Sequence, residues 1–212
     1  MYDYEAEKKK LFQQNLDELE KEILMEPLPD NLNTKIVNFS NNFDFWEKEV
    51  IAKIKKDRMF AANFIKSPSR QNFYEVEALV FLNSMESVEK AEKLPASGAG
   101  AFYVVNGILS HERPDKTYKS IDFHIKMKNG RDIYATHKYT KDEGGAQDNQ
   151  KNDLLQFIQN ARKYRRKEIV FAVIADGAYY DRHGRKELEV EASGSDVVVC
   201  SMESFEEIMN DG

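Results

Sequence analysis

Two neighbouring segments of this chain carry an acidic and a basic side chain that could act together on one substrate. Residues 119–127 contain Asp122, and residues 132–139 contain Lys138. Both segments alternate polar and apolar residues, which is typical of half-buried strands. The Asn-Gly pair between them favours a type I′ hairpin turn, because these two residues accept positive φ angles. We therefore expect a β-hairpin that carries the chemistry of the protein.

The spacing of these side chains would bring an acid and a base to one reacting atom. Side chains two residues apart on a strand share a face, so an acid at position i and a lysine at i+2 would reach the same atom. Carboxylates hold Mg²⁺, which binds a phosphate oxygen and activates water, and a lysine stabilises the developing negative charge. In this chain the residue two before Lys138 is Thr136, which has no carboxylate.

The rest of the chain predicts an α/β protein. After an amphipathic helix, the order is helix, helix, strand, hairpin, helix, strand, strand and helix. We expect helices over 5–26, 43–65, 69–94, 148–165 and 202–209, and strands over 101–109, 168–175 and 196–200 on either side of the hairpin.

The order of these elements from residue 67 to the C-terminus resembles the PD-(D/E)XK nuclease superfamily, and type II restriction endonucleases in particular. Residues 69–75 resemble its first core helix, 119–123 the strand with the invariant acid, and 136–139 the second catalytic strand. Residues 198–207 resemble its closing strand and helix. The resemblance implies a restriction-endonuclease-like core, a mixed central sheet flanked by helices, over residues 67–212. The N-terminal helical region, residues 1–66, would serve dimerisation or DNA contacts.

The same resemblance implies the residues of the site. The implied catalytic residues are Asp122, Lys138, Thr136, Ala135, His137 and Glu75. The implied ligands of a Mg²⁺ cofactor are Asp122, Glu75, Asp148 and Asp153. The implied DNA-binding residues are Arg70, Lys141, Gly144, Gly145, Gln147, Asn149 and Lys151.

The missing acid at position 136 leaves three interpretations open. In the first, the following helix supplies the carboxylate, from Asp148 or Asp153. In the second, the frame is offset by one residue, so that Ala135 replaces the glutamate of some GATC-cleaving relatives and His137 takes the basic position. Ala135 is then a natural loss or an inactivating substitution. In the third, the chain binds DNA without cleaving it.

The charge of the chain permits DNA as a partner. The net charge is −6, but residues 110–168 carry 14 Lys and Arg against 9 Asp and Glu, a local net of +5 that leaves −11 for the remainder. A local basic surface attracts phosphates whatever the total charge. The basic cluster 162–167 is either a helix C-terminus that favours cations or a phosphate contact.

Other signals set the cellular context and exclude alternatives. The single cysteine, Cys200, forms no internal disulfide and suggests a core position, and no CxxC or Cys/His cluster suggests zinc. No apolar run is long enough for a membrane span, so we expect a cytoplasmic protein. The sequence contains neither GxxxxGK[ST] nor GxSxG, which argues against a nucleotide hydrolase or a serine esterase.

We therefore expect a Mg²⁺-dependent type II restriction endonuclease that makes double-strand cuts at a short specific DNA site. Such an enzyme would act as a homodimer and have a cognate DNA methyltransferase as its genetic partner. The alternative is a catalytically inactive DNA-binding or assembly subunit that retains the nuclease fold.

Overall fold

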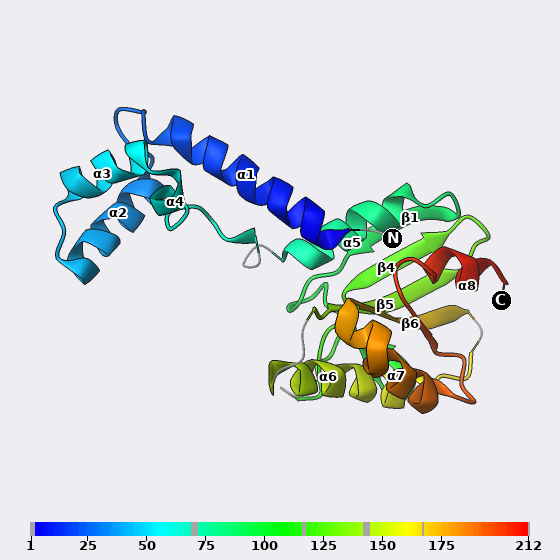
Figure 1. The fold of residues 1–212 in the computed structure, drawn as a ribbon. Helices are drawn as coiled ribbons and strands as arrows, with labels where there is room; N and C mark the ends of the chain where they lie inside the picture. Colours follow the sequence, from blue (N-terminus) through cyan, green and yellow to red (C-terminus); the bar gives the residue numbers. More distant parts are fainter. Residues whose placement is uncertain (1–2, 69–71, 116–117, 142–144, 167, 212) are drawn as a thin grey trace. The chain divides into compact units, whose positions relative to one another are not determined.

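The chain forms two compact units, Asp3–Phe73 and Tyr74–Gly212. A computed structural model describes residues 3–68, 72–115, 118–141, 145–166 and 168–211 (Figure 1). Each unit has its own hydrophobic core, and the residues of the candidate site belong to the second unit.

The first unit is helical. It contains α1 (Tyr4–Glu22), α2 (Asp30–Phe43), α3 (Glu47–Lys56) and the short α4 (Arg58–Ala61). Its core is built from the apolar residues Leu16, Leu19, Ile23, Leu32, Ile36, Val50, Ile54, Ala61 and Phe64. Arg58 joins α4 to α1 through ion pairs with Asp17 at 2.6 Å and Glu20 at 2.5 Å.

The prediction of a single helix over 43–65 was wrong, because two local features interrupt the helix. Asp44 adopts a left-handed conformation, with φ 57°, and ends α2. Asp57 is extended, and its carboxylate accepts a hydrogen bond from the Phe60 amide, which begins α4. Aspartate tolerates both positions because its short side chain can bond to nearby backbone groups.

The second unit is an α/β fold with a mixed sheet, as the sequence predicted. The described residues form a five-stranded sheet in the order β1-β4-β5-β6-β7. The strands are β1 (Val88–Lys93), β4 (Phe123–Met127), β5 (Asp132–Tyr139), β6 (Ile169–Asp176) and β7 (Val198–Cys200). β4 is antiparallel to β1 and β5, whereas β6 is parallel to β5 and β7.

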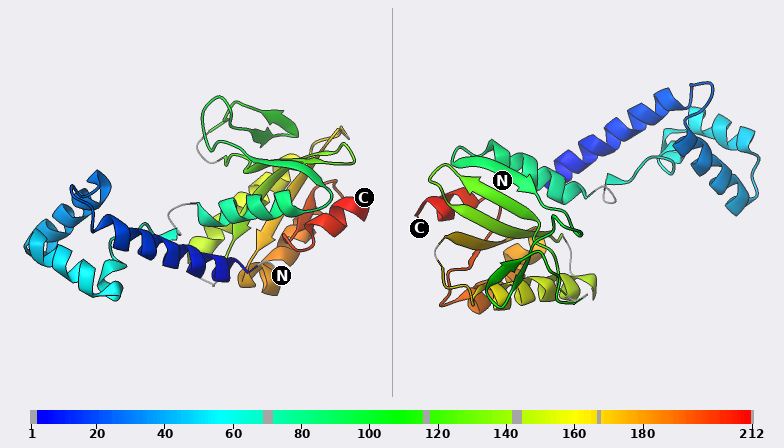
Figure 2. Two further views of the ribbon diagram at one scale, coloured as in Figure 1. Left: turned by 90° about the horizontal axis from the view of Figure 1, so that it is seen from above. Right: turned by 180° about the vertical axis from the view of Figure 1, so that it is seen from behind.

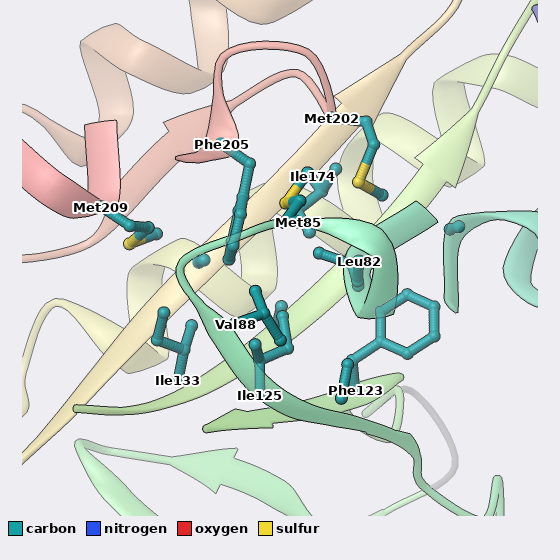
Figure 3. Close-up of a cluster of buried hydrophobic side chains, with 14 of the residues drawn as sticks. Leu82, Met85, Val88, Phe123, Ile125, Ile133, Ile174, Met202, Phe205 and Met209 are labelled. Carbon is teal, nitrogen blue, oxygen red and sulfur yellow. The ribbon is translucent and has the colours of Figure 1, made fainter. Parts of the chain in front are cut away.

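Helices cover both faces of this sheet (Figure 1). α5 (Phe73–Ser84) and α8 (Phe205–Asp211) pack on one face, where Leu82 and Phe205 meet Ile133 and Ile174 (Figure 3). α6 (Gly145–Ala161) and α7 (Arg185–Ala192) pack on the other face, around a second apolar cluster. α6 connects the parallel strands β5 and β6, and α7 connects β6 and β7, as parallel pairing requires.

The start of this unit differs from the expected order. The helix expected over 69–94 ends at Ser84, and its last residues form the edge strand β1. β1 has the sequence VEKAEK, in which only Val88 and Ala91 are buried. Its charged side chains gave no strand signal in the sequence. Charged residues are common on edge strands because they discourage pairing with other chains.

The strand expected over 101–109 lies outside the main sheet. It forms a small hairpin of β2 (Tyr103–Val105) and β3 (Ile108–Ser110), visible apart from the main sheet in Figure 2. Gly107, with φ +76°, turns this hairpin against the C-terminal end of α6, where a Cβ would lie 2.4 Å from the Lys163 carbonyl carbon. Helix α7 and the π-helical turn Tyr180–Gly184 before it were not expected.

The β4–β5 hairpin forms as predicted, but its turn is not type I′. Type I′ requires positive φ at both central residues, and here only Gly130, with φ +86°, is positive. The Gly130 amide donates to the Met127 carbonyl at 2.9 Å, which closes a turn followed by a left-handed glycine. That arrangement is the common three-residue hairpin loop with a bulge.

Within the part of the chain that the structure describes, every helix is too short or too polar to cross a lipid bilayer.

Candidate functional site

Asp122, Thr136 and Lys138 lie on one face of the sheet, at the ends of β4 and β5. Phe123 pairs with Ala135, so Asp122 comes directly opposite Thr136, and Lys138 follows two residues later on the same face. This face is the one that α6 covers. The structure therefore brings together three of the residues that the sequence singled out.

The Asp122 carboxylate closes the end of the hairpin. Its Oδ2 atom accepts a hydrogen bond from the Thr136 hydroxyl at 2.9 Å and another from the His137 amide at 2.8 Å. The chain just before β4 turns away from β5 here, since the Ile121 amide donates a hydrogen bond to the Phe102 carbonyl. The carboxylate thus supplies the acceptor that the neighbouring strand no longer offers, which is a structural role for Asp122.

A small polar pocket lies next to this constellation. Thr136 and Lys138 line it from β5, Asp153 and Asn160 from α6, and Lys119 from the segment before β4. The Lys119 ammonium lies 3.6 Å from the Asp153 carboxylate. The pocket has room for about one water molecule. Asp153, which sequence reasoning placed on the next helix, is therefore directed to the same place as Lys138.

Ala135 and His137 lie on the opposite face from Thr136 and Lys138. Ala135 is fully buried among the apolar residues between the sheet, α5 and α8. His137 is 2% exposed, and its Nε2 atom lies 3.2 Å from Oδ2 of Asp176 on β6. Asp176 in turn accepts a hydrogen bond from the Met202 amide at 2.9 Å. The interpretation with the frame offset by one residue would therefore place its acid, at position 135, and its base, His137, in the core.

Glu75 approaches the sheet from the face opposite α6. It lies on α5 and forms an ion pair with Lys93 on β1. Its neighbour Tyr74 stacks on Tyr139, with ring centroids 4.3 Å apart. The structure therefore does not place Glu75 on the face that carries Asp122 and Asp153.

The residues that could hold a metal ion are Asp122 and Asp153. In the described part of the chain, no three His, Cys, Asp or Glu side chains group as metal ligands. Mg²⁺ commonly takes only one or two protein carboxylates and completes its shell with water and substrate phosphates. Asp122 Oδ1 makes no hydrogen bond with any described residue, and Asp153 is partly exposed. Carboxylate oxygens of this kind are the donors that Mg²⁺ takes in proteins.

The expected DNA-binding residues differ in their surroundings. Lys141 and Asn149 are exposed. The Lys151 ammonium bonds to Glu187 on α7 at 2.8 Å, which raises the pKa of Lys151 and ties it to the protein. Arg70 and Gly144 lie outside the described residues. For Gly145, Gln147 and Asp148, which begin α6, the structure describes only the backbone.

The basic cluster at the end of α6 is largely engaged within the protein. Arg162 pairs with Glu191 at 3.3 Å and also donates to the Ser193 carbonyl. Lys163 donates to the Asn106 side chain at 2.8 Å, and Arg165 donates to the Arg162 carbonyl at 3.1 Å. These contacts fasten α6 to α7 and to the β2–β3 hairpin, so they favour the structural reading of this cluster.

Sequence reasoning missed Asp176, Lys119 and Asn160. Asp176 is the last residue of the otherwise apolar strand β6, and a carboxylate at the carboxyl end of a parallel strand could have been recognised as a candidate. The Tyr180 hydroxyl and the Cys200 thiol are buried and stay protonated at neutral pH. Burial raises the pKa of Tyr180 to about 12 and also raises the pKa of the Cys200 thiol.

Comparison with models of known protein families finds no match for this chain, and comparison with curated proteins finds none either.

Proposed function

We propose that this chain is a Mg²⁺-dependent endodeoxyribonuclease of the PD-(D/E)XK type, which cuts both strands of a short duplex site as type II restriction endonucleases do. The observation that carries the proposal is the placement of Asp122, Thr136 and Lys138 on one face of two antiparallel strands. Once the separate β2–β3 hairpin is left aside, the elements of the main sheet follow in the order α5, β1, β4, β5, α6, β6. This order supports the proposal, because it is the αβββαβ order of that superfamily.

Each residue then has a defined task in phosphodiester hydrolysis, in which water attacks phosphorus and one ester oxygen leaves. Lys138 makes no ion pair with a described residue, so its ammonium is available to the phosphate charge that grows in the transition state. Thr136 and the His137 amide hold Asp122 in one orientation. Asp122 and Asp153 would hold Mg²⁺, which when bound neutralises phosphate charge and lowers the pKa of a bound water.

The second candidate function is DNA binding without cleavage. Thr136 stands where the superfamily has an acid, and its hydroxyl donates to Asp122 instead of adding a second carboxylate. A chain with this feature would act as a DNA-binding or assembly subunit. A DNA methyltransferase gene beside the gene for this chain would favour the nuclease, because a restriction enzyme needs its host DNA protected.

The test is cleavage of unmethylated DNA that contains all short palindromic sites, with and without Mg²⁺. We expect discrete double-strand cuts with Mg²⁺. Asp122→Asn, Asp153→Asn and Lys138→Met should each lower the rate by about 100-fold or more, because each removes a charge from the reacting phosphate. Asp122→Asn keeps an oxygen that accepts from the His137 amide, so folding should be retained.

Lys128→Met is the matched control, because Lys128 is exposed at the hairpin turn, away from the pocket. This variant should cleave DNA at a rate within about two-fold of that of the wild type. Circular dichroism reports the fold of every variant. DNA binding without any cleavage would favour the second candidate. Cleavage that survives the loss of Asp122, Asp153 and Lys138 in turn would remove the proposed site.

A further inference from the structure

The junction of α2 and α3 exposes an unusual set of large apolar side chains. Phe43 is 60% exposed, Phe45 54% and Trp46 78%, and Met59 on α4 is 85% exposed. Single exposed apolar residues are normal on protein surfaces, but consecutive aromatic residues mark binding surfaces. Trp, Phe and Met are the residue types enriched in protein–protein interfaces. We call Phe43, Phe45 and Trp46 the aromatic patch.

The two phenylalanines of the patch pack against the ring of Phe39. The partly buried Phe39 ring lies 4.7 Å from Phe43, 6.3 Å from Phe45 and 5.5 Å from Phe60, measured between ring centroids. The left-handed Asp44 turns the chain between the two exposed phenylalanines. Aromatic anchors that are already ordered lose little conformational entropy when they bind a partner.

A pocket opens beside the protruding Trp46. It has a volume of about 350 Å³ and is lined by Phe45, Val50 and Phe60, with Glu49 and Lys53 at its charged positions. Trp46, Glu49, Val50 and Lys53 follow the i, i+3, i+4, i+7 spacing, so they share one side of α3. An exposed aromatic knob and an apolar hole therefore lie next to each other on one surface.

We propose that this surface is a two-fold symmetric interface with a second copy of this chain. In such an interface the same patch meets itself, so a knob beside a hole allows each Trp46 to enter the pocket of the other copy. Glu49 and Lys53 line that pocket, and each can pair with its opposite in the second copy. The inference rests on the proposed function only for the expectation of a dimer, and the surface is argued from the helical unit itself.

The charges around the patch favour this partner over DNA. Asp44, Glu47 and Glu49 lie among Lys48 and Lys53, so the rim carries both signs. A surface that binds phosphates by charge is predominantly basic. Mixed charge suits a surface that must complement itself.

Sedimentation velocity over a range of protein concentrations tests the interface in the full chain without DNA. We expect a monomer–dimer equilibrium, and Trp46→Ala should raise the dimer dissociation constant by about 30-fold or more, as expected for a central aromatic anchor. Val190→Ala is the matched control, because Val190 is a 70% exposed apolar residue on α7, and it should leave the equilibrium unchanged.

Charge reversal adds a test that a merely structural role would not pass. Glu49→Lys or Lys53→Glu alone should weaken the dimer by about 10-fold, because each places like charges opposite one another. The double reversal should restore it. The Glu49 contact with the Trp46 amide and the Lys53 ion pair with Asp57 are not restored by the double reversal, so thermal stability should stay lowered while dimerisation recovers.

Trp46 is the only tryptophan of the chain, so its fluorescence reports this surface directly. We expect its emission to shift to shorter wavelengths as the dimer forms. A monomer at all concentrations, or a dimer unaffected by Trp46→Ala, would overturn the inference. Quenching of the Trp46 fluorescence when DNA binds to the monomer would also overturn the inference. A monomer that still cleaves DNA would contradict the interface and leave the proposed nuclease standing. A Trp46-dependent dimer that does not cleave DNA would support the interface and contradict the proposed nuclease.

Discussion

Asp122 combines a structural contact with a proposed chemical role, and the two use different oxygens. Oδ2 accepts both hydrogen bonds that close the hairpin, and Oδ1 makes no hydrogen bond with a described residue. A carboxylate that is oriented by two donors can bind a cation without first losing freedom. Replacement by alanine would therefore test folding and chemistry together, whereas Asp122→Asn separates them.

Ala135 gives the sharpest residue-level test of how the motif is read. Ala135→Glu should lower the free energy of unfolding by about 3 kcal/mol or more at neutral pH, because it places a carboxylate in an apolar, fully packed site. Burial raises the pKa of the introduced carboxyl, so the folded state binds more protons than the unfolded state. Stability should therefore fall as pH rises above about 4.3 toward the raised value. Urea unfolding at acidic and neutral pH measures this.

Ala135→Gln is the control for this prediction, because it adds the same volume without the charge and should show no such pH dependence. A stable Ala135→Glu protein that gains Mg²⁺-dependent cleavage would contradict the placement of Ala135 in the core. It would restore the offset reading of the motif.

At the scale of elements, the site depends on how β5, β6 and the turn after β6 are joined. Gly177 has φ +97° and packs against Thr140, where a Cβ would lie 2.3 Å from the Thr140 carbonyl oxygen. That oxygen accepts a hydrogen bond from the Tyr179 amide, and the Thr140 amide donates to Asp176. This glycine therefore allows the chain after β6 to close over the end of β5, next to Lys138.

Gly177→Ala should destabilise the protein by about 2 to 4 kcal/mol, because it adds left-handed strain and a backbone clash. Thermal unfolding measures the effect. Gly98→Ala is the matched control, since Gly98 also has positive φ, +84°, but no atom lies within 4 Å of the added Cβ. The control should cost only about 1 kcal/mol. Equal losses in the two variants would argue against the close approach of Gly177 to β5.

At the scale of the whole molecule, intramolecular contacts reduce the number of basic side chains available to DNA. Residues 110–168 carry a net of +5, but Lys151, Arg162 and Lys163 are engaged with other parts of the second unit. The phosphate contacts are therefore expected to be few and to centre on the polar pocket and the exposed Lys141.

Duplex DNA binding by this protein should weaken by roughly 100-fold between 50 and 200 mM salt, which corresponds to about four phosphate contacts and their released counterions. Fluorescence anisotropy of labelled duplexes in EDTA measures this without cleavage. An affinity that does not change with salt, or no binding at 50 mM salt, would contradict DNA as the partner.

Local sequence patterns were enough to predict part of this protein. The alternation in 119–139 predicted the β4–β5 hairpin, and the apolar run near 168–175 predicted the buried strand β6. Both signals depend on residues that are close in sequence, and they also placed Asp122 and Lys138 on adjacent strands. The break near Pro27 and Pro29 was equally local, because proline ends a helix by its own geometry.

The tertiary structure alone decided which face of the hairpin could form a site. Alternation specifies that Thr136 and Lys138 share one face and Ala135 and His137 the other, but not which face the core takes. That choice depends on α5, α8 and α6, which are distant in sequence. The same holds for the His137–Asp176 contact, for Lys119 beside Asp153, and for β1, whose strand conformation depends on pairing with β4. Long-range packing made these choices, since it overrides weak local preference.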